Sequence, residues 1–113
     1  MNHLAVQIEN APSNYVTHGI KESMHFWNNQ ADSLIRKNKS GEYGNAETQK
    51  MAQTMQADDF MLEMLLIDCK TFCNSQFAKD SGNTYECGRT RSHIWVHLNG
   101  KRVLMLYSKK FMN

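Results

Sequence analysis

Hydrophobic and polar residues alternate at the amino-terminal end of the chain. The apolar positions are Leu4, Val6 and Ile8, and the residues between them are smaller or polar. A period of two is typical of a strand that buries one of its faces. The pattern therefore predicts a short strand, which Pro12, the only proline, would bring to an end.

From Tyr15 the apolar residues recur every three or four positions, which is the period of an amphipathic helix. These residues are Val16, Ile20, Met24, Trp27, Ala31 and Leu34 or Ile35. Ser13 and Asn14 are each suited to cap the helix, because their side chains accept a hydrogen bond from its first turn. We expect a helix from Tyr15 to about Lys37, followed by a loop over the glycine-containing segment 38–45.

A second helical pattern extends from Ala46 to about Lys79. Its apolar stripe is Met51, Met55, Leu62, Leu65 or Leu66, Cys69, Phe72 or Cys73, and Phe77. One helix of that length is unusual in a small domain. Asp58 and Asp59 are favourable at a helix N-terminus, so we expect a break near them. Gly82 follows where a glycine commonly ends a helix.

The carboxyl-terminal part of the chain predicts a hairpin. Asn99-Gly100 lies between two apolar-rich segments, and this dipeptide is the strongest local signal for a two-residue turn. The turn sets a register whose pairs are Val96 with Val103, Ile94 with Met105, Trp95 with Leu104, and His97 with Arg102. The residues expected in the core are then Ile94, Val96, Val103 and Met105. The other face would carry Arg89, Arg91, His93, Trp95, His97, Arg102, Leu104 and Leu106.

These elements predict an α+β fold in a single domain, residues 1–113. A small antiparallel sheet, formed by the N-terminal strand and the C-terminal hairpin, would pack against two or three helices. A hairpin alone is marginally stable, so we expect the N-terminal strand to pair with it. No apolar segment approaches the length of a membrane span.

Positive charge is concentrated at the carboxyl-terminal end. Residues 87–113 hold six Lys or Arg residues and no Asp or Glu, whereas residues 1–86 have a net charge of −4. Such an asymmetry indicates a docking surface for something negative. The expected partner is an acidic protein surface or a nucleoprotein complex, with nucleic acid itself as the alternative and no membrane.

The candidate binding residues lie on this basic hairpin. They are Arg89, Arg91, His93, Trp95, His97, Lys101 and Arg102. Cations beside aromatic rings hold single-stranded nucleic acid, and Trp and Arg are also typical anchors of protein interfaces. Leu104 and Leu106 on the same face argue against nucleic acid. The competing interpretation is that Trp95 and both leucines are buried under a helix.

Other groups of residues carry weaker signals. Cys69, Cys73 and Cys87 with His93 and His97 offer zinc ligands, but cysteines in a helical stripe are usually small buried hydrophobes. We therefore expect free cysteines and no metal or other cofactor. An odd number of cysteines also favours a reducing cytoplasm.

The acidic residues Asp58, Asp59, Glu63 and Asp68 would suit a small metal-dependent nuclease, although their spacing matches no nuclease signature. A solvated helix start is the simpler interpretation. No catalytic motif is present in the sequence, so we expect a non-enzymatic binding protein that modulates or inhibits a macromolecular partner. A phage-type inhibitor of a host defence or nucleic-acid-processing complex is the leading hypothesis. RNA or single-stranded DNA binding is the alternative, and the nuclease comes third.

Overall fold

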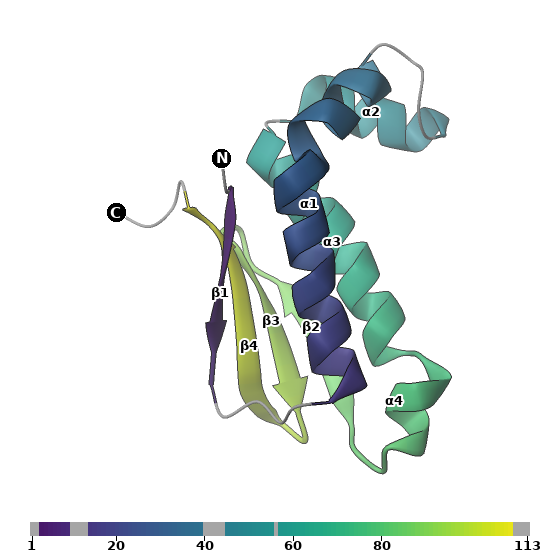
Figure 1. The fold of residues 1–113 in the computed structure, drawn as a ribbon, viewed down its shortest axis with the longest axis vertical. Helices are drawn as coiled ribbons and strands as arrows, with labels where there is room; N and C mark the ends of the chain where they lie inside the picture. Colours follow the sequence, from purple (N-terminus) through teal and green to yellow (C-terminus); the bar gives the residue numbers. More distant parts are fainter. Residues whose placement is uncertain (1–2, 10–13, 40–44, 56, 110–113) are drawn as a thin grey trace.

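The computed structural model describes residues 3–9, 14–39, 45–55 and 57–109. Within these residues an antiparallel sheet forms one layer and helices form the other (Figure 1). The strands lie in the order β1-β4-β3-β2. The predicted α+β fold is confirmed. The elements are β1 (Leu4–Ile8), α1 (Tyr15–Lys39), α2 (Ala46–Thr54), α3 (Ala57–Cys73), α4 (Gln76–Asp80), β2 (Tyr85–Arg89), β3 (His93–Leu98) and β4 (Lys101–Ser108).

The N-terminal strand pairs with the C-terminal hairpin, as predicted. Strand β1 lies at one edge of the sheet beside β4, with Leu4 opposite Ser108 and Ile8 opposite Leu104. Helix α1 then begins where Asn14 accepts a hydrogen bond from the backbone N–H of Thr17 at 3.0 Å. Asn14 is therefore the cap, one of the two predicted. Pro12 and Ser13 lie outside the described residues.

The second helical region is divided into three helices among the described residues. The break between α2 and α3 lies just before Asp58, where it was predicted. Ser75 caps α4 by accepting a hydrogen bond from the N–H of Ala78 at 3.2 Å. Because α4 is a separate helix, Phe77 does not continue the buried stripe and is 53% exposed. Residues 40–44 of the predicted loop and the side chains of Ala31, Leu34, Ile35 and Met51 are not described.

The predicted position of the hairpin turn is confirmed, but the predicted register is wrong beyond the pair next to the turn. Asn99 and Gly100 have φ angles of 52° and 85°, as a tight two-residue hairpin turn requires. His97 pairs with Arg102, as predicted, and a β-bulge follows at Val103. The bulge inserts one residue in β4, so every later pair is shifted. The observed pairs are Val96 with Leu104, Trp95 with Met105, Ile94 with Leu106 and His93 with Tyr107.

The shift exchanges the faces of the β4 residues from Leu104 onward. Val103 and Leu104 are both buried, and Leu106 is completely buried. Met105 was predicted in the core but is half-buried on the opposite face. The apolar residues of β4 are consecutive, so their order along the chain does not reveal which of them face the helices. Ile94 and Val96 are buried, as predicted.

A second turn interrupts the strand that was predicted to run from Arg89 to His97. The backbone N–H of Thr90 donates to the carbonyl of His93 at 2.8 Å, which closes the turn between β2 and β3. Arg89 therefore belongs to β2, and Arg91 lies in the turn. The sheet gains a fourth strand in this way, with Tyr85 opposite Leu98 and Arg89 opposite Ile94.

The core lies between the sheet and helices α1 and α3. Its completely buried side chains include Ile20, Phe60, Met61, Leu62, Leu65, Ile94, Leu104 and Leu106. Asp58 joins the start of α3 to β4 and to the residue before β1, because it contacts His3 Nδ1 at 2.6 Å and accepts from Ser108 Oγ at 2.6 Å. In the part of the chain that is described, no helix is long and apolar enough to cross a bilayer.

Candidate functional site

The sheet has one face that the described helices do not cover (Figure 1). Helices α1 and α3 pack on the side of Ile94, Val96 and Leu104, so residues that alternate with these point the other way. We call this set the open-face cluster, and its members are His93, Trp95, His97, Met105 and Tyr107. All five are half-buried. The competing interpretation is therefore wrong for Trp95, whereas Leu104 and Leu106 are buried in the core, as it predicted.

Cross-strand pairing places the cluster in adjacent rows. Trp95 lies opposite Met105 on β4 and opposite Gly88 on β2. Tyr107 lies opposite His93 in the next row. Side chains of directly opposed residues are neighbours across antiparallel strands, so the rings form a continuous surface. The rings of Trp95 and His97 are in contact, with centroids 4.4 Å apart and planes inclined by 40°.

Gly88 determines how the indole of Trp95 lies. A Cβ atom at Gly88 would be only 2.3 Å from Trp95 Cζ2, which is far inside van der Waals contact. The absence of a side chain lets the indole rest against the backbone of β2. An aromatic ring across a strand glycine is a recognised means of protecting the bare backbone. Trp95 is thus held between Gly88 and His97 rather than extending freely into solvent.

Two of the predicted binding cations are occupied by ion pairs. Arg89 Nη1 pairs with Glu63 of α3, and its side chain is only 16% exposed. Arg89 therefore joins β2 to the helical layer. Arg102 pairs with Glu9 through both ends of its guanidinium, with Nη2–Oε1 at 2.6 Å and Nε–Oε2 at 3.2 Å. The hydrogen bond and charge of Glu9 raise the pKa of Arg102 above its usual value.

The remaining predicted cations do not form one patch. Arg91 and Lys101 are exposed, and within the described residues neither has an acidic group within ion-pairing distance. Arg91 lies in the turn before β3, and Lys101 is the first residue of β4, beside the other end of β3, which has six residues. At about 3.3 Å per residue, about 20 Å separates them.

The structure thus gathers only part of the predicted binding set. His93, Trp95, His97 and Arg102 share the open face, and Arg102 reaches Met105 Sδ at 3.8 Å. Met105, Tyr107 and Gly88 were not among the binding residues predicted from the sequence. The only signal in the sequence for the first two is the uninterrupted apolar segment of β4, which is compatible with a bulge.

The three cysteines lie on the helix-covered side of the sheet, opposite the open face. Cys69 and Cys73 are buried one turn apart on α3, and Cys73 lies next to Cys87 of β2. The interaction between these two thiols raises the pKa of Cys73 and lowers that of Cys87, whereas burial raises the pKa of Cys69. His93 and His97 face away, so the proposed zinc ligands are not brought together. Among the described residues no group of three His, Cys, Asp or Glu is arranged to hold a metal.

Cys87 should be the first thiol to react in the native protein. It is half-buried, and its lowered pKa gives it more thiolate at neutral pH than its two buried neighbours have. Limiting iodoacetamide at pH 7, followed by peptide mass spectrometry, should place the first label on Cys87. Labelling of Cys69 or Cys73 at an equal rate in folded protein would contradict this assignment.

Three of the four acidic residues considered for a nuclease make different contacts. Asp58 contacts His3 and Ser108, and Glu63 pairs with Arg89. Asp68 accepts hydrogen bonds from Ser23 and from Trp27 Nε1, the latter at 2.8 Å. These carboxylates connect helices and strands, so they do not converge on a shared metal position.

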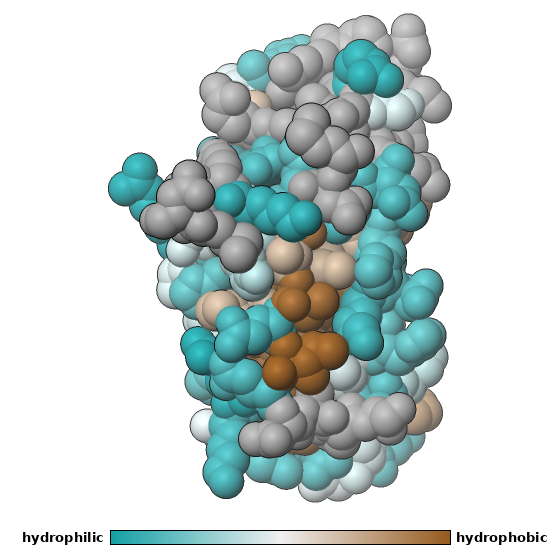
Figure 2. Space-filling view, turned by 60° about the vertical axis from the view of Figure 1, so that its left-hand side comes forward, coloured by the Kyte–Doolittle hydropathy of each residue, from teal (hydrophilic) through white to brown (hydrophobic). Residues whose placement is uncertain are grey.

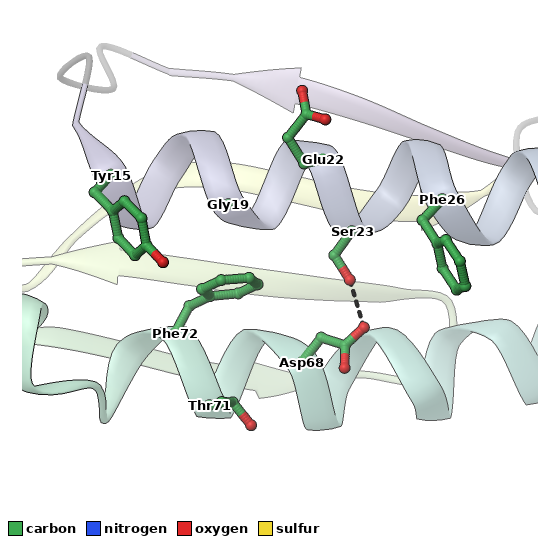
Figure 3. Close-up of a pocket in the computed structure, with 8 residues that line it drawn as sticks. All are labelled: Tyr15, Gly19, Glu22, Ser23, Phe26, Asp68, Thr71 and Phe72. Atoms are coloured by element: carbon green, nitrogen blue, oxygen red, sulfur yellow. Dashed lines mark hydrogen bonds between the residues drawn. The ribbon is translucent and has the colours of Figure 1, made fainter. Parts of the chain in front are cut away.

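A hollow lies between α1 and α3, on the outer side of the helical layer (Figure 3). Its volume is about 570 Å³, and the Phe72 ring packs against Gly19, where a Cβ would lie 2.6 Å from Phe72 Cε1. Ser23 and Asp68 are joined by a hydrogen bond inside it, and Glu22 points away. No histidine or lysine is among the described lining residues, and the hydrogen-bond partner of Ser23 is the carboxylate of Asp68.

Comparison with known protein families, with curated proteins and with solved structures finds no match for this chain.

Proposed function

We propose that this is a non-enzymatic binding protein that docks on a macromolecular partner through the open-face cluster and modulates or inhibits it. The observation that carries the proposal is the position of Trp95. It lies at the centre of the uncovered sheet face, oriented by Gly88 and His97. A tryptophan held in one orientation loses little conformational entropy when it binds, which makes it a favourable interface anchor.

A protein surface is the partner class that we favour. Arg89 and Arg102 are ion-paired, so Arg91 and Lys101 are the candidate cations left for phosphate groups. These two cations are about 20 Å apart, so a short single strand of nucleic acid would make few phosphate contacts with them. An apolar and aromatic centre with charges at its rim is instead the usual arrangement of a protein interface. An acidic partner surface, alone or within a nucleoprotein complex, would complement that rim.

The mode of action that we propose is steric. A chain of 113 residues without an assembled catalytic group among its described residues can still prevent another molecule from reaching the surface on which it docks. Phage-type inhibition of a host defence or nucleic-acid-processing complex belongs to this class of action. This hypothesis rests on the small size of the chain and on its binding face.

Single-stranded nucleic acid is the second candidate, and the β-bulge supports it. The predicted register placed Leu104 and Leu106 beside Trp95, which suited nucleic acid poorly. The observed register replaces them with Met105 and Tyr107. The open face then carries two aromatic rings and two imidazoles, and such rings can stack on bases.

Affinity isolation from host lysate should distinguish the two candidates. We expect the immobilised protein to retain a specific partner after nuclease treatment, and a Trp95→Ala bait to lose it. A Phe77→Ala bait serves as the control, because Phe77 is an exposed aromatic residue on α4 rather than on the open face. Retention that disappears with nuclease would favour the nucleic-acid candidate, and equal retention by all three baits would contradict the proposed surface.

A further inference from the structure

Strand β1 leaves hydrogen-bonding groups free at the edge of the sheet. The N–H of Glu9 donates to Val103 at 2.8 Å, and the N–H of Lys109 donates to His3 at 2.9 Å. Hydrogen-bonded pairs alternate along antiparallel strands, so Ala5 and Gln7 also bond to β4. The backbone groups of Leu4, Val6 and Ile8 therefore point away from the sheet.

Asn28 of α1 closes one end of this edge. Its Oδ1 accepts from the N–H of Leu4 at 2.8 Å, and its Nδ2 donates to the carbonyl of Leu4 at 3.0 Å. The side-chain amide thus takes the place of a neighbouring strand at Leu4. Within the described residues, Val6 and Ile8 have no such partner for their outward N–H and C=O groups.

The free part of the edge lacks the usual protection against pairing. Exposed edge strands commonly carry charged residues, proline or bulges. The five residues of β1 include none of these, and Ile8 is 47% exposed. Figure 2 brings the β1 side of the molecule forward and shows hydrophobic residues gathered there between hydrophilic ones. The other edge strand, β2, carries the charged residues Glu86 and Arg89.

We propose that β1 pairs antiparallel with β1 of a second copy of this chain, across a twofold axis at Gln7. Such an interface is self-complementary, as a closed dimer requires. Val6 would face Ile8 of the second copy and Ile8 would face its Val6. Each hydrogen-bonded pair exchanges two bonds, so the two free residues of each copy satisfy one another completely.

The side chains fit the same register. Val6 and Ile8 lie on the helical side of the sheet, and directly opposed residues share a face. The exposed Ile8 side chain would therefore be covered by Val6 of the second copy. Pairing would stop at Leu4, whose groups are already bonded to Asn28. The carboxylate of Glu9 is paired with Arg102, so Glu9 adds no unpaired charge near the proposed twofold axis.

The dimer would extend the sheet and place both open faces on the same side. The two Trp95 residues would be separated by five strand spacings, or about 24 Å. Two linked binding faces can engage a repetitive partner with higher avidity than one. The interface itself is small, so we expect the dimer to form in a concentration-dependent manner.

Sedimentation velocity from about 10 μM to about 1 mM tests the proposal, because dissociation constants in this range correspond to weak association. The mass of the wild-type chain should rise from the 13.1 kDa monomer toward a dimer. Amide hydrogen exchange at Val6 and Ile8 should slow over the same range. A wild-type chain that stays monomeric throughout would overturn the proposal.

Two variants locate the interface. Val6→Pro removes an outward N–H that the fold does not use, and should raise the dimer dissociation constant more than about tenfold without unfolding the chain. Ile8→Lys should act similarly, whereas Ile67→Lys, at an isoleucine of α3 that is 54% exposed, should not. Circular dichroism verifies folding. If folded Val6→Pro and Ile8→Lys still dimerise as the wild type does, the dimer uses another surface and the proposal fails.

Discussion

The Asn28→Ala variant should lose about 3 kcal/mol of unfolding free energy, because a buried donor or acceptor without a partner costs about 1–3 kcal/mol. The substitution leaves the N–H and the carbonyl of Leu4 without partners, and Leu4 is only 1% exposed. It also removes the acceptor that the N–H of His3 reaches at 3.1 Å. The attachment of β1 to α1 depends on these bonds.

Asn29→Ala is the matched control, since the neighbouring asparagine is exposed on the same helix. Its unfolding free energy should change by less than about 0.5 kcal/mol, as is usual at exposed positions. Urea denaturation with linear extrapolation measures both variants. A loss below about 1 kcal/mol for Asn28→Ala would show that water replaces the amide and that Asn28 does not hold the edge strand.

Local signals in the sequence were sufficient for most of the fold. The alternation at Leu4, Val6 and Ile8 located β1, and the three-to-four spacing after Tyr15 located α1. Asn99-Gly100 located the turn between β3 and β4. Each of these signals is produced by neighbouring residues, through periodicity or backbone conformation, so it can be recognised without knowledge of the tertiary structure.

The face of β4 could not be predicted in the same way. Val103, Leu104, Met105 and Leu106 are all apolar, so alternation does not show which of them point to the helices. The bulge resolves this by burying both Val103 and Leu104. One inserted residue then moves Met105 to the open face, and the composition of the candidate site changes with it.

The sequence also did not show how much of the positive charge of the hairpin is neutralised by acidic residues of other elements. Residues 87–113 contain no acidic residue, but folding brings Glu63 to Arg89 and Glu9 to Arg102. Both acids come from other elements, and Glu9 is 93 residues away from its partner. Counting charge along a segment cannot reveal this neutralisation. The open face is therefore more aromatic and less basic than the sequence indicated.

The affinity for the captured partner should fall at least about 30-fold in Trp95→Ala, because anchor residues of this kind contribute about 2 kcal/mol or more. Phe77→Ala should stay within about threefold of wild type. Gly88→Ala retains the indole but forces it from its place, since the added Cβ would lie 2.3 Å from the ring. A marked loss in Gly88→Ala would show that the orientation of Trp95 matters as well as its presence.

Calorimetric or fluorescence titration across a salt series measures these affinities and separates the partner classes. A protein partner should give a shallow salt dependence, because exposed charges at the rim mainly affect association rates. A nucleic acid should give a steep log-linear dependence from counterion release. Unchanged affinity in Trp95→Ala and Gly88→Ala, with folding verified by circular dichroism, would exclude the open face as the docking surface. The hollow between α1 and α3, lined by Tyr15 and Phe26, would then be the next surface to test.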